Sequence, residues 1–126
     1  MSFKVLMIIK AVVCLGFGPV MLFLPGPLLT LLGSSFGPGA AITAREYGAS
    51  LVGNMLLAWF ARKAEDSEAR RAIILALFVY DAVALVAMLV IQLTGGMNWL
   101  GWGVVAIYLF FTVGFGYFLL PKKKAS

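Results

Sequence analysis

Four apolar segments, each about as long as the hydrocarbon core of a bilayer is thick, occupy most of this chain. A membrane-spanning helix needs roughly 20 mainly apolar residues, and such segments cover about residues 3–24, 42–61, 72–93 and 99–120. Only 12% of the residues are charged, against about 25% in soluble domains, and the mean hydropathy is +1.03. The sequence therefore predicts an all-α integral membrane protein, a single bundle of four transmembrane helices over residues 1–126.

The first segment is predicted to be a retained, kinked helix. Its charged start resembles that of a signal peptide, but its apolar run is longer than the usual signal and a Pro-Gly-Pro sequence replaces the cleavage site. Pro19 lies near its centre and cannot donate a hydrogen bond to the carbonyl of Leu15, which predicts a kink. The kink is consistent with packing alone and also with the broken helices that shape substrate sites in transporters.

The basic residues predict the topology. In a four-crossing protein, nine of the ten fall on one side and only Arg45 falls on the other; the nine are Lys4, Lys10, Arg62, Lys63, Arg70, Arg71, Lys122, Lys123 and Lys124. By the positive-inside rule, both termini and the 62–71 loop are cytoplasmic. The three lysines of the tail are interpreted as a topology anchor in contact with anionic lipid, with a specific lipid site as the alternative. Topology accounts for the net charge of +5, so no nucleic-acid partner is expected.

Several kinds of chemistry lack the residues they need. The sequence has no histidine and a single cysteine, Cys14, so His-based metal sites, haem ligation by histidine and dithiol redox chemistry are excluded. No phosphate-binding glycine loop is present, and Asp81 is the only acid deep in an apolar segment. We expect no catalytic residues, no metal and no cofactor.

One polar residue of each predicted helix lies at a similar depth. Counted from the cytoplasmic ends at 1.5 Å per residue, Lys10, Asn54, Asp81 and Thr112 all lie roughly 10–14 Å inside. Charges in hydrocarbon cost at least about 2.5–3.5 kcal/mol and normally face the bundle interior, so Lys10 and Asp81 are predicted to form an ion pair within a polar layer. The layer is interpreted as an interhelical clamp; a proton- or cation-responsive carboxylate, or a pocket for a lipid or quinone head group, is the alternative. A further alternative is that Lys10 extends to the surface and Asp81 is protonated.

A second group of polar residues is expected nearer the outer surface. It comprises Arg45, Glu46, Tyr47 and Tyr108. Arg45 and Glu46 are interpreted mainly as interfacial anchors, with Arg45 reaching lipid phosphates; the alternative is that Glu46 faces Tyr108 or the outer end of the polar layer. The leucine-rich outer loop, residues 25–41, is predicted to contain a short helical turn.

Several short segments carry a resemblance to known proteins: residues 44–49, 58–62, 101–102 and 114–120, together with Arg70-Arg71. In these segments the chain resembles small uncharacterised bacterial membrane proteins of four helices, loosely grouped with the DoxX-like families. The resemblance implies a multi-pass protein of the bacterial cytoplasmic (inner) membrane, and some DoxX relatives are implied to be membrane subunits of oxidoreductases. It carries no catalytic residue onto this sequence.

Taken together, these features predict a non-enzymatic membrane protein. The leading hypothesis is an accessory or structural subunit of a larger membrane complex, for example a respiratory or photosynthetic one, or a homo-oligomer. Its partners are membrane lipids and other membrane subunits or copies of itself. The alternative is a small transporter or a lipid- or quinone-binding protein that uses the Asp81 layer, and a membrane enzyme acting on a quinone or lipid comes third.

Overall fold

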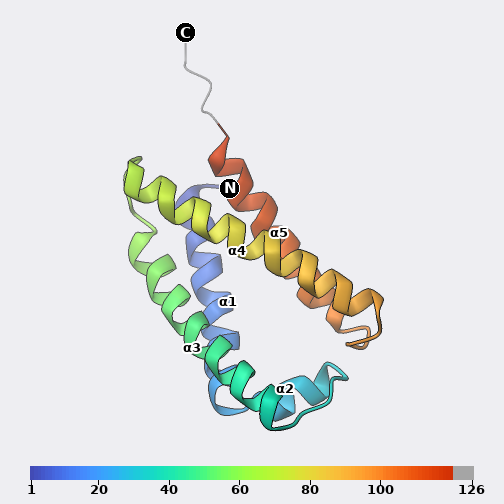
Figure 1. Ribbon diagram of the computed structural model, residues 1–126. Helices are drawn as coiled ribbons and strands as arrows, with labels where there is room; N and C mark the ends of the chain where they lie inside the picture. The colour runs from blue at the N-terminus through green and yellow to red at the C-terminus, as the bar shows by residue number, and fades with distance from the viewer. Residues whose placement is uncertain (121–126) are drawn as a thin grey trace.

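The computed structural model describes residues 1–120 and contains five helices and no strand in that range. The helices are α1 (Phe3–Phe23), α2 (Pro25–Leu31), α3 (Pro38–Ala61), α4 (Glu68–Leu93) and α5 (Gly101–Leu119), as Figure 1 shows. Three of them, α1, α4 and α5, are long and apolar enough to cross a membrane. α3 has 24 residues, but Arg45, Glu46 and several small or polar residues make it less apolar than the other three. The protein is thus all-helical, with three candidate membrane spans among the described residues.

Two of the long helices, α3 and α4, start at residues that favour a helix N-terminus and not where the apolar segments begin. α3 starts at Pro38, whose fixed φ suits the first position of a helix. α4 starts after Ser67, whose side chain accepts a hydrogen bond of 3.2 Å from the backbone N–H of Arg70. Both helices therefore begin four residues before the predicted apolar segments. α1 is one helix with Pro19 inside it, and its kink stays a prediction.

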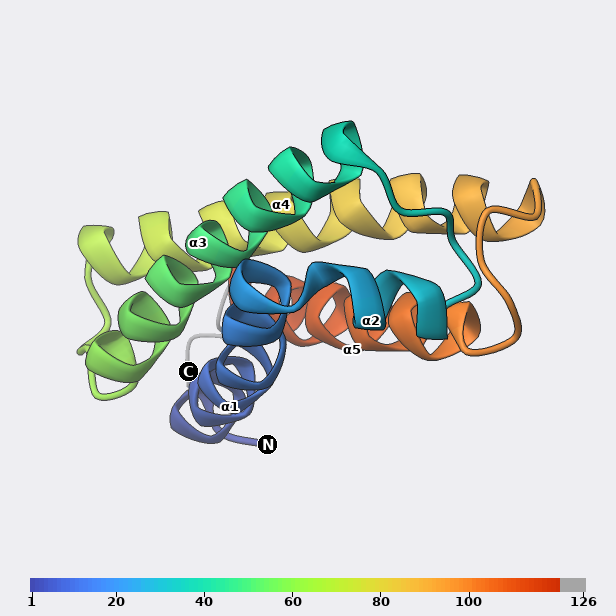
Figure 2. The same ribbon diagram turned by 90° about the horizontal axis from the view of Figure 1, so that it is seen from below.

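The four long helices pack as two pairs. α1 packs most closely against α3, and α4 packs most closely against α5 (Figures 1 and 2). Glycines set the distance within the first pair, because a Cβ placed on Gly48 of α3 would lie 2.6 Å from the backbone N of Leu22 and 2.8 Å from the carbonyl oxygen of Gly18, both in α1. The lack of a side chain at Gly48 therefore lets the backbones of α1 and α3 approach closely.

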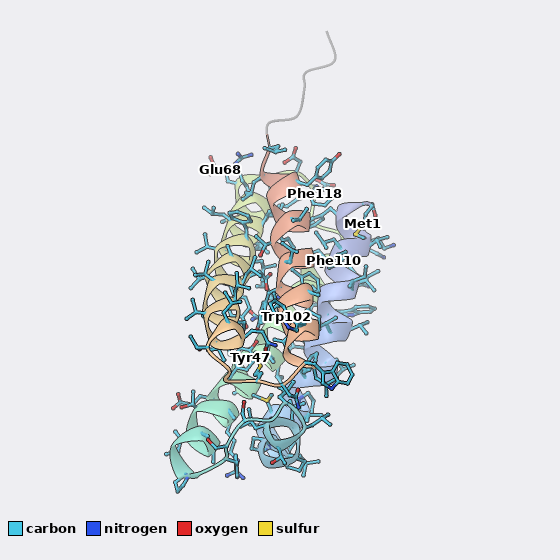
Figure 3. The ribbon with its side chains drawn as sticks, turned by 90° about the vertical axis from the view of Figure 1, so that its right-hand side faces the viewer. Met1, Tyr47, Glu68, Trp102, Phe110 and Phe118 are labelled. Carbon is cyan, nitrogen blue, oxygen red and sulfur yellow. The ribbon has the colours of Figure 1, made fainter. Side chains whose placement is uncertain are left out.

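One end of the bundle gathers most of the basic residues found within residues 1–120, and we call it the basic end. The Arg71 guanidinium donates a 3.3 Å hydrogen bond to the carbonyl of Leu119, which joins the start of α4 to the end of α5. The Arg70 guanidinium lies 4.0 Å from the centre of the Phe3 ring at the start of α1. Figure 3 shows Met1, Glu68 and Phe118 near this end. Residues predicted to share one side of a membrane thus lie together in space.

The opposite end, which we call the far end, is closed by loop-to-loop hydrogen bonds. The backbone N–H of Asn98 donates to the carbonyl of Leu32 at 2.7 Å, and the Asn98 side-chain amide donates to the carbonyl of Leu31 at 2.8 Å. The Ser34 hydroxyl donates to the carbonyl of Gly96 at 2.6 Å. These bonds tie α2 and the residues after it to the α4–α5 turn, and α2 is the short helix expected in the outer loop.

The interior next to the basic end is a close-packed hydrophobic core. All four long helices contribute to it, and the buried members are Phe3, Leu6, Met7, Ala11, Ala58, Ala61, Ile74, Leu77, Phe111 and Phe115. Leu6, Met7 and Phe115 have no exposed surface. This core joins the two helix pairs at the basic end.

Candidate functional site

A buried ion pair lies at the inner boundary of the hydrophobic core. The Lys10 Nζ and Asp81 Oδ1 atoms are 2.8 Å apart, which joins α1 to α4 across the two helix pairs. The two side chains are 3% and 0% exposed. Because each charge is removed from solvent, each depends on the other for compensation.

Two aromatic rings lie beside the ammonium group of the ion pair. The Lys10 Nζ atom lies 4.5 Å from the ring centre of Phe111 and 5.1 Å from that of Tyr80, distances at which a ring face attracts a cation. The second carboxylate oxygen of Asp81, Oδ2, is buried and has no hydrogen-bond partner among the described residues. The pair is therefore held by one direct hydrogen bond and by ring contacts to the ammonium group.

Three tyrosines, one from each of α3, α4 and α5, meet through their hydroxyl groups. The Tyr80 hydroxyl donates to the Tyr47 hydroxyl at 2.9 Å, and the Tyr47 and Tyr108 hydroxyls share a hydrogen bond whose donor is either of the two. The rings of Tyr80 and Tyr108 pack edge to face, with centres 6.3 Å apart. We call Tyr47, Tyr80 and Tyr108 the tyrosine cluster. It links α3 of the first helix pair to both helices of the second.

A cavity of about 560 Å³ opens beyond these polar groups, between the two helix pairs. Lys10, Cys14 and the three tyrosines line it on the side of the core, and the remaining lining is almost entirely apolar. All five helices contribute to its wall. Its volume lies within the range of about 300–1,000 Å³ that is usual for small-molecule sites.

Small side chains make room for the cavity. Ala84 and Ala87 of α4 and Ala40 and Ala44 of α3 lie in its wall, where larger residues would fill the space. At the far end, leucines of α2 and its following turn cover the cavity. The same turn carries the hydrogen bonds to Asn98 and Gly96 described above, so the cover is fixed to the α4–α5 turn.

The predicted polar layer is assembled only in part. Lys10 and Asp81 meet, whereas the Thr112 hydroxyl donates to the carbonyl of Tyr108 in its own helix at 2.7 Å. Asn54 is half-buried, and no hydrogen bond of the described residues joins it to the pair. The layer is thus a two-residue pair with Asn54 and Thr112 outside it.

The predicted outer-side residues separate into two kinds. Tyr47 and Tyr108 point inward and join the tyrosine cluster, whereas Arg45 and Glu46 are exposed on α3. The alternative in which Glu46 faces Tyr108 is not what the structure shows, because the partners of Tyr108 are the other tyrosines. Lys122, Lys123 and Lys124 lie outside the described residues.

Tyr80 is a site residue that sequence reasoning missed. It directly precedes Asp81, the charged residue on which the prediction of a polar layer depends. A signal was present, because Tyr80, Ala84 and Ala87 follow at spacings of four and three on one helical face. A tyrosine on a face of small residues marks a polar group next to either open space or a closely packed helix, and the structure shows that open space lies beside Tyr80.

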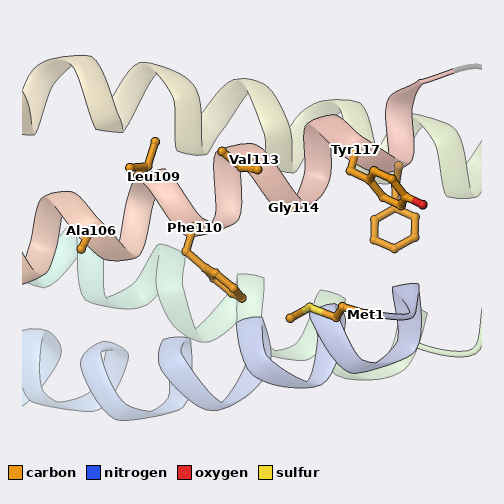
Figure 4. Close-up of a pocket in the computed structure, with 8 residues that line it drawn as sticks. Met1, Ala106, Leu109, Phe110, Val113, Gly114 and Tyr117 are labelled. Carbon is orange, nitrogen blue, oxygen red and sulfur yellow. The ribbon is translucent and has the colours of Figure 1, made fainter.

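A second hollow, of about 570 Å³, lies on the outer surface between α5 and the start of α1 (Figure 4). Its wall includes the exposed side chains of Met1, Val113 and Tyr117. Unlike the cavity between the helix pairs, it is lined by no charged side chain. It is a mainly apolar surface groove with the Tyr117 side chain in its wall.

The described residues offer binding groups but no metal site. Within residues 1–120, no three side chains of His, Cys, Asp or Glu are grouped so that they could hold a metal ion. The ammonium group, three hydroxyls and a large apolar wall can instead orient a small molecule by hydrogen bonds and enclose its apolar part.

Comparison with known proteins gives no match: no family model, no curated protein and no solved structure is significantly similar to this chain.

Proposed function

We propose that the chain is a multi-pass protein of the bacterial cytoplasmic membrane, with four crossing helices and both termini in the cytoplasm. Three apolar helices support membrane insertion, and the bias of basic residues supports the orientation. α3 returns the chain between α1 and α4, and its 24 residues extend about 36 Å at 1.5 Å per residue, enough for a fourth crossing. A kink at Pro19 belongs to the same proposal.

Within that membrane, the proposed function is to bind a small apolar molecule inside the bundle. The observation that carries this proposal is the cavity between the two helix pairs, with its apolar wall and its floor of Lys10 and the tyrosine cluster. The cavity is partly open to the surroundings, since Thr43, Ala87 and Ile91 in its wall are exposed, so a molecule can enter it. An accessible apolar space with polar groups at its floor supports binding over a purely structural role.

The single cysteine provides the test. Cys14 lines the cavity and is 2% exposed. In purified protein, we expect an apolar probe such as undecane to slow the reaction of Cys14 with the small uncharged reagent dithiodipyridine, because the occupied cavity excludes the reagent. Thiol modification measured by absorbance against probe concentration gives the apparent affinity.

A matched control separates occupancy from general effects of the probe on the detergent. The Cys14→Ala/Val83→Cys variant moves the thiol to a position on α4 that is 64% exposed in the native protein and outside the cavity wall. Its reaction rate is expected to stay constant as the probe is added. Equal rates for Cys14 with and without every apolar probe contradict the binding proposal.

An accessory-subunit or homo-oligomer role stands as a second proposal, supported by a different observation. Gly16 of α1 and Gly53 of α3 face open space, with no atom within 4 Å of a Cβ placed on either. Small residues on a lipid-facing surface let a partner helix approach closely. Native mass spectrometry after gentle extraction is expected to show a partner or a second copy, and a monodisperse monomer contradicts this role.

A further inference from the structure

We infer that the molecule held in the cavity is neutral and carries a hydrogen-bond-accepting oxygen, such as a carbonyl, which the tyrosine cluster and Lys10 bind. This inference rests on the proposed binding function and names the ligand class. It depends on three observations: the count of hydroxyl protons in the cluster, the donors of Lys10, and the charge of the site.

The tyrosine cluster has one more donor than it uses. Three phenol groups carry three O–H protons, and the two hydrogen bonds that join the hydroxyls use two of them; the third is left for the weaker Tyr80–Tyr108 contact or for a ligand oxygen. If Tyr47 donates to Tyr108, the Tyr108 proton is spare; if Tyr108 donates to Tyr47, the Tyr47 proton is spare. Either way the cluster offers one O–H at the cavity wall, where all three side chains lie.

Lys10 adds further donors in the same place. An ammonium group has three N–H donors, and the contact with Asp81 Oδ1 uses one. Phe111 and Tyr80 present ring faces to the ammonium, which attract it but are not acceptor oxygens. Asp81 does not line the cavity, so its unpartnered oxygen is not offered to a ligand. The cavity floor thus has donors in excess, which favours an acceptor on the ligand.

The charge balance selects a neutral acceptor over an anion. Lys10 and Asp81 already compensate each other at 2.8 Å, so the site has no net charge for a carboxylate to neutralise. A buried ion without a partner loses its hydration and receives too little in return. A carbonyl accepts the spare hydrogen bonds without that cost, and the apolar wall encloses the remaining body of the molecule.

A matched series of probes tests this inference through the protection of Cys14. Methyl decanoate carries a neutral acceptor, undecane has none, decanoic acid presents an anion when ionised, and decylamine presents a cation rich in donors. Methyl decanoate is expected to bind about tenfold more tightly than undecane, the effect of one net hydrogen bond of ordinary strength. The acid is expected to bind more weakly than the ester, and the amine most weakly.

Variants locate the preference in the tyrosine cluster. Removing one hydroxyl is not informative, because the two remaining phenols form at most one hydrogen bond with each other and still have a spare O–H proton. The informative variant therefore removes all three hydroxyls: Tyr47→Phe/Tyr80→Phe/Tyr108→Phe. It keeps the rings and the apolar wall, and the preference for ester over undecane is expected to fall several-fold. Tyr117→Phe is the control, because Tyr117 is 66% exposed and lies outside the cavity wall; its preference is expected to match that of the native protein.

The outcomes distinguish the ligand class from the binding function itself. Equal protection by undecane and methyl decanoate keeps the cavity as a binding site and overturns the inference of an acceptor. Tighter binding of the acid overturns the neutrality of the ligand. Protection by none of the four probes overturns both the inference and the proposed function. If the triple variant does not fold, the probe series on the native protein still tests whether the ligand is a neutral hydrogen-bond acceptor.

Discussion

The two halves of the bundle interior differ in how completely they are filled. The packed half, at the basic end, contains the ten buried core residues from Phe3 to Phe115 described above. The hollow half, at the far end, contains the cavity of about 560 Å³. The four long helices wall both halves, and α2 joins them around the cavity. The two helix pairs diverge toward the far end (Figure 1), and small side chains there leave the space between them open.

The border between the halves is polar. Lys10 contacts Phe111, a member of the core, and also lines the cavity. On one side of it lie the bulky Leu6, Met7 and Phe115, and on the other lie alanines such as Ala84. The comparison teaches that one half holds the helix pairs together, which leaves the other half free to remain open.

The largest expected effect comes from breaking the border itself. Lys10→Met or Asp81→Asn alone is expected to lower the free energy of unfolding by about 3–5 kcal/mol, because each leaves its partner without compensation in the interior. The double variant is expected to recover part of that loss. Thermal unfolding in detergent, followed by tryptophan fluorescence, measures all three. Strictly additive losses contradict a coupled pair.

Truncating leucines in the two halves sharpens the contrast. Leu6→Ala in the packed half is expected to cost about 2–5 kcal/mol, since Leu6 is fully buried. Leu29→Ala in the hollow half is expected to cost less, about 0.5–1 kcal/mol, because Leu29 is only half-buried and faces the cavity. Similar losses at both positions would show that the cavity is filled in solution. Unfolding in one detergent, under identical conditions, allows the comparison.

A smaller effect is expected where the first helix pair meets. Gly48→Ala places a Cβ 2.6 Å from the backbone of α1 and is expected to cost about 1–3 kcal/mol, as overpacked sites do. Gly53→Ala is the control on the same helix, because nothing lies within 4 Å of its Cβ. It is expected to leave stability unchanged or raise it by about 0.5–1 kcal/mol through lower backbone entropy. A reversed order would mean that α1 and α3 do not meet at Gly48.

The smallest effect on stability is expected from filling the hollow half. Ala84→Leu is expected to change the free energy of unfolding by no more than about 0.5 kcal/mol, because the new side chain enters the cavity, yet it should weaken probe protection of Cys14. Val83→Leu adds volume on the exposed face of the same turn and should leave protection intact. Probe titration and thermal unfolding of both variants give the result. Unchanged protection in Ala84→Leu contradicts the assigned wall.

The sequence predicts the helical class and the meeting of Lys10 and Asp81 well, and the physical reasons are simple. Long apolar segments have few structural options, because backbone polar groups must be satisfied within the segment. Two opposite charges in such segments are the natural partners of each other. Counting residues from the helix ends, however, also predicts that Asn54 and Thr112 lie in the polar layer. Thr112 satisfies its hydroxyl within its own helix, an option that depth does not reveal.

The cavity and the close helix contact could not be located from the sequence. Small residues allow both a hole and a close approach, and spacing does not tell them apart: Gly48 meets α1, whereas Gly53 faces open space. Ala84 lies beside a cavity, whereas Ala58 is buried in the core. The choice depends on which helix faces which, and that is a property of the assembled pairs. Tyr80 became a site residue for the same reason.

The separation of Lys10 and Asp81 along the chain has a consequence for biosynthesis. The two residues are 71 positions apart, and a ribosome makes the lysine first. In the proposed topology, α1 leaves the ribosome before its partner charge exists, and meanwhile the long lysine side chain can reach towards the interface. The contact can form only once α4 has been made. A chain truncated before α4 therefore keeps an unmatched charge in α1.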